Sequence, residues 1–285
     1  MNQAYKLENI SRSYEDKVVL ENISLEFDRG KIYALVGENG SGKSTLLDTL
    51  GLLEAPQQGK IYFNNKEVNF KNNLFSLRQK ITFCMQQPHL FRTSVYDNIA
   101  YGLRTRQVLD VNKKIKDISG QFGIISLLDK KSTTLSGGEA QKIALARTFI
   151  LETPIILLDE PTANLDETSI DVLNKVLLQM KQKHITVIIA THLIDNAFRL
   201  ADEVITIKDK QAYPESHQNF FTGQIQAANG LKVLKLNGQV SFILATDKQG
   251  QVKASIDPKE IIISKEKFES SARNCLKGRV SSIID

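Results

Sequence analysis

The chain has 285 residues, of which 41% are hydrophobic and 24% are charged, and its formal net charge is +5 at pH 7. This length suits one large domain plus a small one, and the composition is ordinary for a soluble globular protein. No apolar run approaches the roughly 18 residues that span a bilayer, and the N-terminus lacks the pattern of a signal peptide. The two cysteines make no disulfide framework, so we expect a cytoplasmic protein in which Cys84 is a buried small side chain.

The pattern up to about residue 210 predicts strands alternating with helices. Residues 5–14 and 18–27 are typical of an antiparallel strand pair. Longer apolar runs predict buried strands at residues 31–36, 155–159 and 185–190. Helices are expected to begin at residue 44 and over 167–183, and a helical subdomain is expected over about 90–140. Together these elements predict an α/β fold with a mostly parallel sheet.

A second, smaller domain is expected after the first, with the boundary between Tyr213 and Pro214. The first domain then spans 1–213 and the second 214–285, where short apolar runs separated by turns predict a small all-β fold. Residues 219–225 line up with 274–280, in a match that arises either by chance or because a second copy of a β unit begins there. That copy reaches Asp285 after about one strand, so this domain is expected to be incomplete.

A glycine-rich loop after the strand at 31–36 fits the pattern G-x-x-x-x-G-K-[ST] at residues 37–44 and precedes a helix, the context that a phosphate-binding loop requires. Glycines let the backbone N–H groups converge on phosphate, and the helix N-terminus adds partial positive charge. Lys43 is expected to neutralise the β and γ oxygens, and Ser44 to ligate Mg²⁺. The predicted nucleotide-binding residues are Gly37, Glu38, Asn39, Gly40, Ser41, Gly42, Lys43, Ser44 and Thr45.

A carboxylate pair ends the buried strand at 155–159. Asp159 is placed at the strand end, where it can hold Mg²⁺ through water. Glu160 comes next and can polarise the water that attacks the phosphate.

Two further polar residues follow other predicted strands at the same edge of the sheet. His192 follows the strand at 185–190 and is predicted to sense the γ-phosphate. Gln86 follows the run ITFCM and can contact Mg²⁺ or the water, although an ordinary place at the edge of the core is an equal alternative.

A second potential anion-binding helix N-terminus lies at residues 135–139, with the sequence LSGGE. One chain needs only one such loop for one nucleotide. The second loop is explained if it caps a nucleotide held by another subunit.

These motifs resemble those of ATP-binding cassette ATPases, the nucleotide-binding subunits of ABC transporters. The resemblance covers about residues 5–210 and includes the phosphate loop, the LSGGE signature, the Asp159–Glu160 pair and the histidine. It implies that Tyr14 stacks on adenine and that Asn164-Leu165-Asp166 forms the D-loop, although this sequence reads TANLD where SALD is commoner.

The same resemblance implies two chains paired head to tail with two ATP molecules between them. Ser136, Gly137 and Gly138 would then contact ATP across the interface, and the cycle would drive a transmembrane permease fed by a solute-binding protein. The cassette would lie at the cytoplasmic face of the membrane, and no nucleic-acid partner is expected. The residues after Gln86 would dock the permease, although the apolar residues there are as well explained as core: Leu90, Phe91, Val95 and Tyr96.

The tail SARNCLKGRV resembles the start of the TOBE or Mop-type domain that follows the ATPase in molybdate and tungstate importers. This resemblance implies import of one of these oxyanions. Because the unit is expected to be incomplete, a packing and dimerisation domain without a ligand is an equal alternative.

The main alternative to an oxyanion importer is an importer for another solute, such as a polar amino acid, phosphate or sulfate. A soluble ABC ATPase of DNA repair or translation is a distant one, because the chain has one cassette and neither a heptad run nor a CxxC motif. A soluble oxyanion-binding protein that uses the cassette as a switch is a third.

Overall fold

The computed structural model describes residues 3–15, 17–72, 74–192, 200–215, 220–228, 231–236, 241–246, 249–255 and 274. The chain forms two compact units, Met1–Ser216 and His217–Asp285. Tyr213 and Pro214, where the boundary was predicted, lie inside strand β10 (Gln211–Glu215), which pairs with β9 (Glu203–Lys208). Both residues therefore belong to the first unit, and the division falls slightly later than expected.

A six-stranded sheet forms the centre of the first unit, in the order β10-β9-β3-β8-β7-β6. Its remaining strands are β3 (Ile32–Val36), β6 (Ile81–Cys84), β7 (Ile155–Asp159) and β8 (Thr186–Ala190). All neighbours except β9 and β10 run parallel. Along β3, Ile32 and Ala34 pack into one apolar core while Tyr33 and Leu35 pack into another. The predicted apolar runs are continuous because both faces of the sheet are covered.

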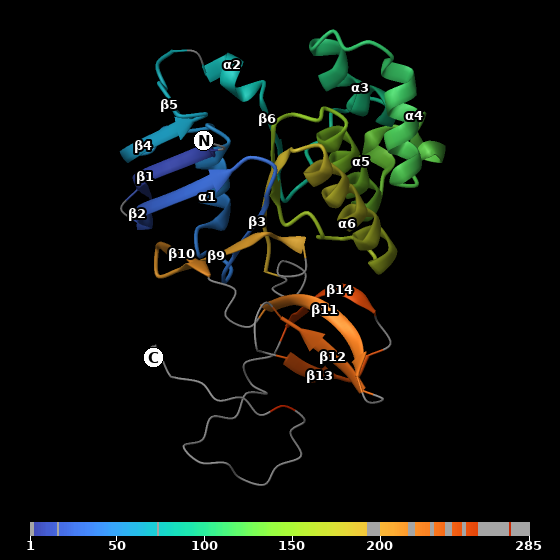
Figure 1. The fold of residues 1–285 in the computed structure, drawn as a ribbon. Helices are drawn as coiled ribbons and strands as arrows, with labels where there is room; N and C mark the ends of the chain where they lie inside the picture. The colour runs from blue at the N-terminus through green and yellow to red at the C-terminus, as the bar shows by residue number, and fades with distance from the viewer. Residues whose placement is uncertain are drawn as a thin grey trace. The chain divides into compact units, whose positions relative to one another are not determined.

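A four-stranded antiparallel sheet lies on one side of the first unit, opposite the helices α3 and α4 (Figure 1). Its strands are β1 (Gln3–Tyr14), β2 (Lys17–Asp28), β4 (Gln58–Phe63) and β5 (Lys66–Glu67), in the order β2-β1-β4-β5. The predicted pairing of the first two strands is confirmed. Helix α1 (Lys43–Leu50) contacts β2, β7 and β8, and so joins the two sheets.

The helices of the first unit include a group that lies within the range predicted for a helical subdomain. These are α3 (Val95–Thr105) and α4 (Val111–Gln121), with the short 3₁₀ turns η1 (Ile125–Leu127) and η2 (Ser132–Thr134). Helix α5 (Gly137–Phe149) contacts both α3 and β6, so it links this group to the central sheet. The other helices are α2 (Leu74–Arg78) and α6 (Glu167–Gln182).

The second unit contains an all-antiparallel sheet in the order β13-β12-β11-β14, in agreement with the predicted small β fold. Its strands are β11 (Phe220–Ala228), β12 (Leu231–Lys235), β13 (Ser241–Leu244) and β14 (Gly250–Ser255). Its core contains Ile225, Leu234 and Phe242. Of the predicted repeat, Asn219 and residues 275–280 lie outside the described residues, whereas the Asn274 amide accepts from and donates to the backbone of Ile243.

Asp166 begins helix α6, where its carboxylate accepts a 2.7 Å hydrogen bond from the N–H of Ser169. The Ser169 hydroxyl and N–H, and then the Thr168 hydroxyl, lower the pKa of Asp166 from its ordinary 3.8 to about 2. A carboxyl group whose pKa is lower in the folded than in the unfolded chain stabilises the fold when the pH is above the unfolded pKa. This contribution to stability is lost as the pH falls toward about 2, the folded pKa of Asp166. We expect Asp166→Ala to lower the thermal unfolding midpoint near neutral pH. We also expect the midpoint of this variant to change less with pH between about pH 4 and 2. Asp171→Ala, at an exposed site in the same helix, is the control, and an equally steep acid dependence in Asp166→Ala would contradict the assignment.

Candidate functional site

The glycine-rich loop predicted to bind phosphate, residues 37–44, connects β3 to α1 and lies at the carboxyl end of the central strands. Gly37 has φ 153°, and a Cβ there would lie 2.4 Å from the carbonyl oxygen of Ile207 in β9. Gly42 has φ 108°, and a Cβ there would lie 2.8 Å from Leu20 in β2. Only glycine allows the loop to pass this close to both sheets, so Gly37 and Gly42 are required by packing.

Lys43 is the cation of this loop and is 6% exposed. Its Nζ donates hydrogen bonds to the carbonyl oxygens of Gly37 at 2.8 Å and Glu38 at 3.0 Å. The charge is therefore held inside the curl of the loop. A phosphate oxygen is a stronger acceptor than a neutral carbonyl, so this placement suits a phosphate-binding lysine.

Asp159 lies at the end of β7 and is 6% exposed. Burial raises the pKa of this carboxyl, a hydrogen bond with Ser44 lowers it, and the neighbouring Glu160 raises it further. Its Oδ1 is buried without a hydrogen-bond partner among the residues that the structure describes. A buried carboxylate oxygen beside a serine hydroxyl fits Mg²⁺, which takes few protein ligands and completes its shell with phosphate and water. No group of three or more His, Cys, Asp or Glu side chains suited to a metal occurs in the described part of the chain.

Glu160 and His192 meet at the ends of β7 and β8. The Nδ1 of His192 lies 2.8 Å from Oε2 of Glu160, and the N–H of Glu160 donates to the carbonyl oxygen of Ala190 at 2.9 Å. Glu160 has φ 43°, in the left-handed region that a side chain adopts rarely. The Glu160 carboxylate is largely buried, whereas the His192 side chain is 60% exposed. The contact with His192 therefore fixes the orientation of the carboxylate next to a surface that solvent can reach.

Gln86 follows β6, whose last residue, Cys84, pairs in register with Leu158 of β7. This places Gln86 at the same sheet edge as Asp159. The Gln86 side chain is exposed, and the structure gives it no hydrogen bond to another described residue. Its contact with Mg²⁺ or water therefore stays a prediction.

Tyr14 ends strand β1 and is 43% exposed, which leaves its ring accessible for stacking. The Arg12 guanidinium carbon lies 5.5 Å from the centre of that ring. Arg12 is 3% exposed and bonds to the Glu54 carboxylate and the Ala55 carbonyl. Arg12 was not predicted from the sequence as a residue of the site. It is a buried cation on the same strand as the exposed Tyr14, and its contact with the ring orients that ring.

The LSGGE segment forms the start of α5. Ser136 caps this helix through a reciprocal pair of hydrogen bonds with Glu139, and both Ser136 and Gly137 are exposed. Within the described part of the chain, no hydrogen bond or ion pair joins residues 136–138 to residues 37–45. An exposed and capped helix N-terminus of this kind can bind an anion.

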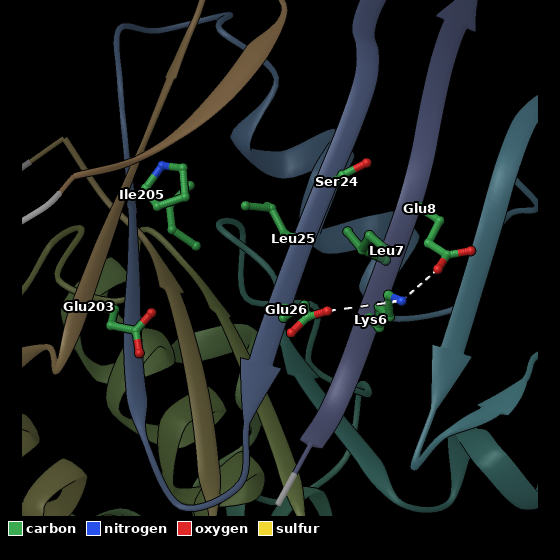
Figure 2. Close-up of a pocket in the computed structure, with 9 residues that line it drawn as sticks. Lys6, Leu7, Glu8, Ser24, Leu25, Glu26, Glu203 and Ile205 are labelled. Carbon is green, nitrogen blue, oxygen red and sulfur yellow. Dashed lines mark ion pairs between the residues drawn. The ribbon is translucent and has the colours of Figure 1, made fainter. Parts of the chain in front are cut away.

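A cavity of about 350 Å³ lies apart from these residues, between β1, β2 and β9 (Figure 2). Lys6 extends toward the carboxylates of Glu8 and Glu26, at 2.6 and 4.0 Å. The lining residues are Lys6, Leu7, Glu8, Ser24, Leu25, Glu26, Glu203, Ile205 and Pro214. None of the predicted site residues lines it, and its balance of acidic groups does not suit a phosphate.

None of the helices described here is both long enough and apolar enough to cross a bilayer. Residues 20–163 match the family described as ABC transporter. The molybdate/tungstate import ATP-binding protein WtpC of Thermococcus kodakarensis is 30% identical, with 98% of this chain and 89% of that protein covered. The tungstate uptake system ATP-binding protein TupC of Peptoclostridium acidaminophilum is 32% identical, with 70% of this chain and 92% of that protein covered.

The fold also has a counterpart among solved structures. A dimeric ATP-binding cassette in a post-hydrolysis state, bound to ADP and Pi, is 28% identical with a TM-score of 0.69, over 74% of this chain and 98% of that one. The chain therefore belongs to the ABC transporter family, and its first unit is an ATP-hydrolysing cassette.

Proposed function

We propose that this chain is the ATP-hydrolysing subunit of an importer for an oxyanion, molybdate or tungstate, acting with a separate permease and a solute-binding protein. The observation that carries the proposal is the likeness to WtpC, which extends over 98% of the chain and so includes the second unit. In this arrangement the chain lies at the cytoplasmic face of the membrane, held there by the permease.

The proposed chemistry uses the residues at the strand ends. Lys43 and the N–H groups of its loop bind the β- and γ-phosphates of ATP. Ser44 and Asp159 would hold Mg²⁺, which supplies positive charge against the phosphate oxygens. Glu160 orients a water molecule on the γ-phosphorus, and a new P–O bond forms as the bond to the β–γ bridging oxygen breaks.

His192 is proposed to sense the γ-phosphate, and its Nδ1 lies 2.8 Å from Oε2 of Glu160, a contact that orients the carboxylate. Gln86 follows the neighbouring strand and is proposed to contact the metal or the water. Tyr14 is proposed to stack on adenine, with Arg12 behind its ring.

Two copies of the chain are proposed to pair head to tail around two ATP molecules. Ser136, Gly137 and Gly138 of one copy then contact the ATP that the other copy binds. This pairing accounts for a capped and exposed α5 N-terminus that makes no bond to the phosphate loop of its own chain.

The surface after Gln86 is proposed to receive the permease. The structure separates the four apolar residues of this stretch: Val95 is 0% exposed and Leu90 and Tyr96 pack against the core, whereas Phe91 is 46% exposed. The Phe91 ring lies 4.7 Å from that of Tyr101, which is 53% exposed. The expectation of docking therefore narrows to an aromatic pair, Phe91 and Tyr101.

We expect Phe91→Ala to weaken coupling to the permease severalfold while the ATPase activity of the isolated chain stays unchanged, because truncating an exposed aromatic removes contact area but no core packing. The measurement is ATP hydrolysis by the chain alone and in the reconstituted complex. Phe75→Ala, at a 77% exposed site on α2, is the matched control. Equal stimulation of both variants by the permease would exclude Phe91 from the interface.

The cargo is tested by ATP hydrolysis in the complex reconstituted with its permease and binding protein, titrated with tungstate, molybdate, sulfate and phosphate. Stimulation by tungstate or molybdate at nanomolar concentration is expected. Stimulation by phosphate or sulfate alone would support an importer for that solute instead, and no response to any of the four anions would support an importer for another solute, such as a polar amino acid. A chain that associates with no permease would favour a soluble ABC ATPase or a soluble oxyanion-binding protein.

The second unit is proposed to have a role separate from choosing the cargo. TupC, named for tungstate uptake, aligns with only 70% of this chain while 92% of its own length is covered. Oxyanion sensing and simple packing or dimerisation both remain proposals for the second unit. Isothermal titration of the full chain with tungstate separates them, since only a sensor binds the anion without the permease.

A further inference from the structure

Gln141 is a fully buried polar side chain in helix α5 that the proposed reaction does not use. Its Nε2 donates a 3.2 Å hydrogen bond to the carbonyl oxygen of Pro161. Its Oε1 is buried and has no hydrogen-bond partner within the described residues. Burying an amide costs free energy unless its hydrogen bonds are made, so core packing alone does not explain a half-satisfied glutamine.

The carbonyl that Gln141 binds belongs to the residue directly after Glu160. Proline has no N–H, so this carbonyl is the only hydrogen-bonding group that the Pro161 backbone offers. The turn that follows is closed by the N–H of Ala163, which donates to the Glu160 carbonyl at 3.0 Å. Because Glu160 has φ 43°, its backbone keeps this conformation only while its neighbours hold it.

The first turns of α5 pack against the same segment at two further points. A Cβ at Gly138 would lie 2.8 Å from the carbonyl oxygen of Asn164, so α5 approaches the turn too closely for any side chain there. The Nζ of Lys142 lies 3.9 Å from the Asp166 carboxylate. The N-terminal part of α5 therefore meets residues 161–166 at three points, Pro161, Asn164 and Asp166.

In the head-to-tail pair, Ser136 and Glu160 of one chain serve different ATP molecules. We propose that Gln141 is a positioning residue that couples the two ATP sites of the dimer. A shift of α5, when its N-terminus contacts the other chain's ATP, reaches the Glu160 backbone through the bond from Gln141 to Pro161. Because Oε1 has no hydrogen-bond partner among the described residues, the amide follows α5 without breaking a second hydrogen bond there. The inference rests on the proposed pairing.

The experiment compares ATP hydrolysis against ATP concentration for the unaltered chain, Gln141→Met and Gln121→Met. Methionine keeps the length and volume of glutamine but donates no hydrogen bond. Gln121, exposed at the end of α4, controls for the substitution itself. The unaltered chain and Gln121→Met are expected to be cooperative, with a Hill coefficient above one.

For Gln141→Met we expect the Hill coefficient to fall to about one and kcat to fall roughly tenfold, while the half-saturating ATP concentration stays within about twofold. A variant that loses kcat or thermal stability but stays as cooperative as the control would overturn the inference, because that result describes a structural role alone. If Gln141→Met does not fold, Gln141→Glu is measured in its place with the same readouts.

The proposed pairing is checked before Gln141 is changed. Glu160→Gln is mixed with ATP and its size is measured by gel filtration. A dimer that forms only with ATP is the expected result. A chain that stays monomeric there would overturn the pairing and the coupling together, whereas a dimer with unchanged cooperativity in Gln141→Met would overturn the coupling alone.

Discussion

Glu160→Gln is expected to lower kcat for ATP hydrolysis by roughly 10²- to 10⁴-fold, the usual contribution of a residue that acts on the attacking water. The amide has the shape of the carboxylate and fits the same buried place, where Glu160 is 7% exposed. ATP binding is expected to survive, because Lys43 and the loop glycines are untouched. The chain should then accumulate as an ATP-bound dimer.

Steady-state phosphate release and gel filtration with ATP measure the two effects of Glu160→Gln. Glu167→Gln, on the exposed first turn of α6, is the matched control and should hydrolyse ATP normally. Turnover retained in Glu160→Gln would show that another group acts on the water. The neighbouring His192 would be the first residue to test, since it lies 2.8 Å from the same carboxylate.

Lys43→Met should weaken ATP binding roughly 10- to 100-fold, which corresponds to the loss of charge-assisted hydrogen bonds to the phosphates. The lysine is 6% exposed inside the loop, so methionine fills its space without adding bulk. Its hydrogen bonds to the carbonyls of Gly37 and Glu38 are lost as well. A modest fall in the unfolding midpoint without nucleotide is therefore expected.

Binding of a fluorescent ATP analogue to Lys43→Met is compared with binding to Lys60→Met. Lys60 is an exposed cation of β4 that pairs with Glu67 at 3.0 Å, so its loss removes the same charge from a site unrelated to phosphate. Equal affinity in the two variants would contradict the role of Lys43. Weak binding in both would point instead to a general effect of net charge.

Prediction from the sequence worked best where a local pattern decides the structure. The apolar run at 32–36 and the glycine loop after it form β3 and the start of α1 as expected. Prediction was weaker where packing decides. Val95 and Phe91 are both apolar and close in sequence, yet one is 0% exposed and the other 46%. Tyr213 and Pro214 have the composition of a linker but pair with β9.

The sequence by itself determined the α/β class and the family, because both depend on motifs of neighbouring residues or on the periodicity of apolar side chains. Only the tertiary structure decided which distant groups meet. The register that pairs Asp159 with Ala190 brings Glu160 to His192, and the packing of α5 brings Gln141 to Pro161. Such contacts depend on strand order and helix placement, which arise from the burial of the whole core and leave no local pattern in the chain.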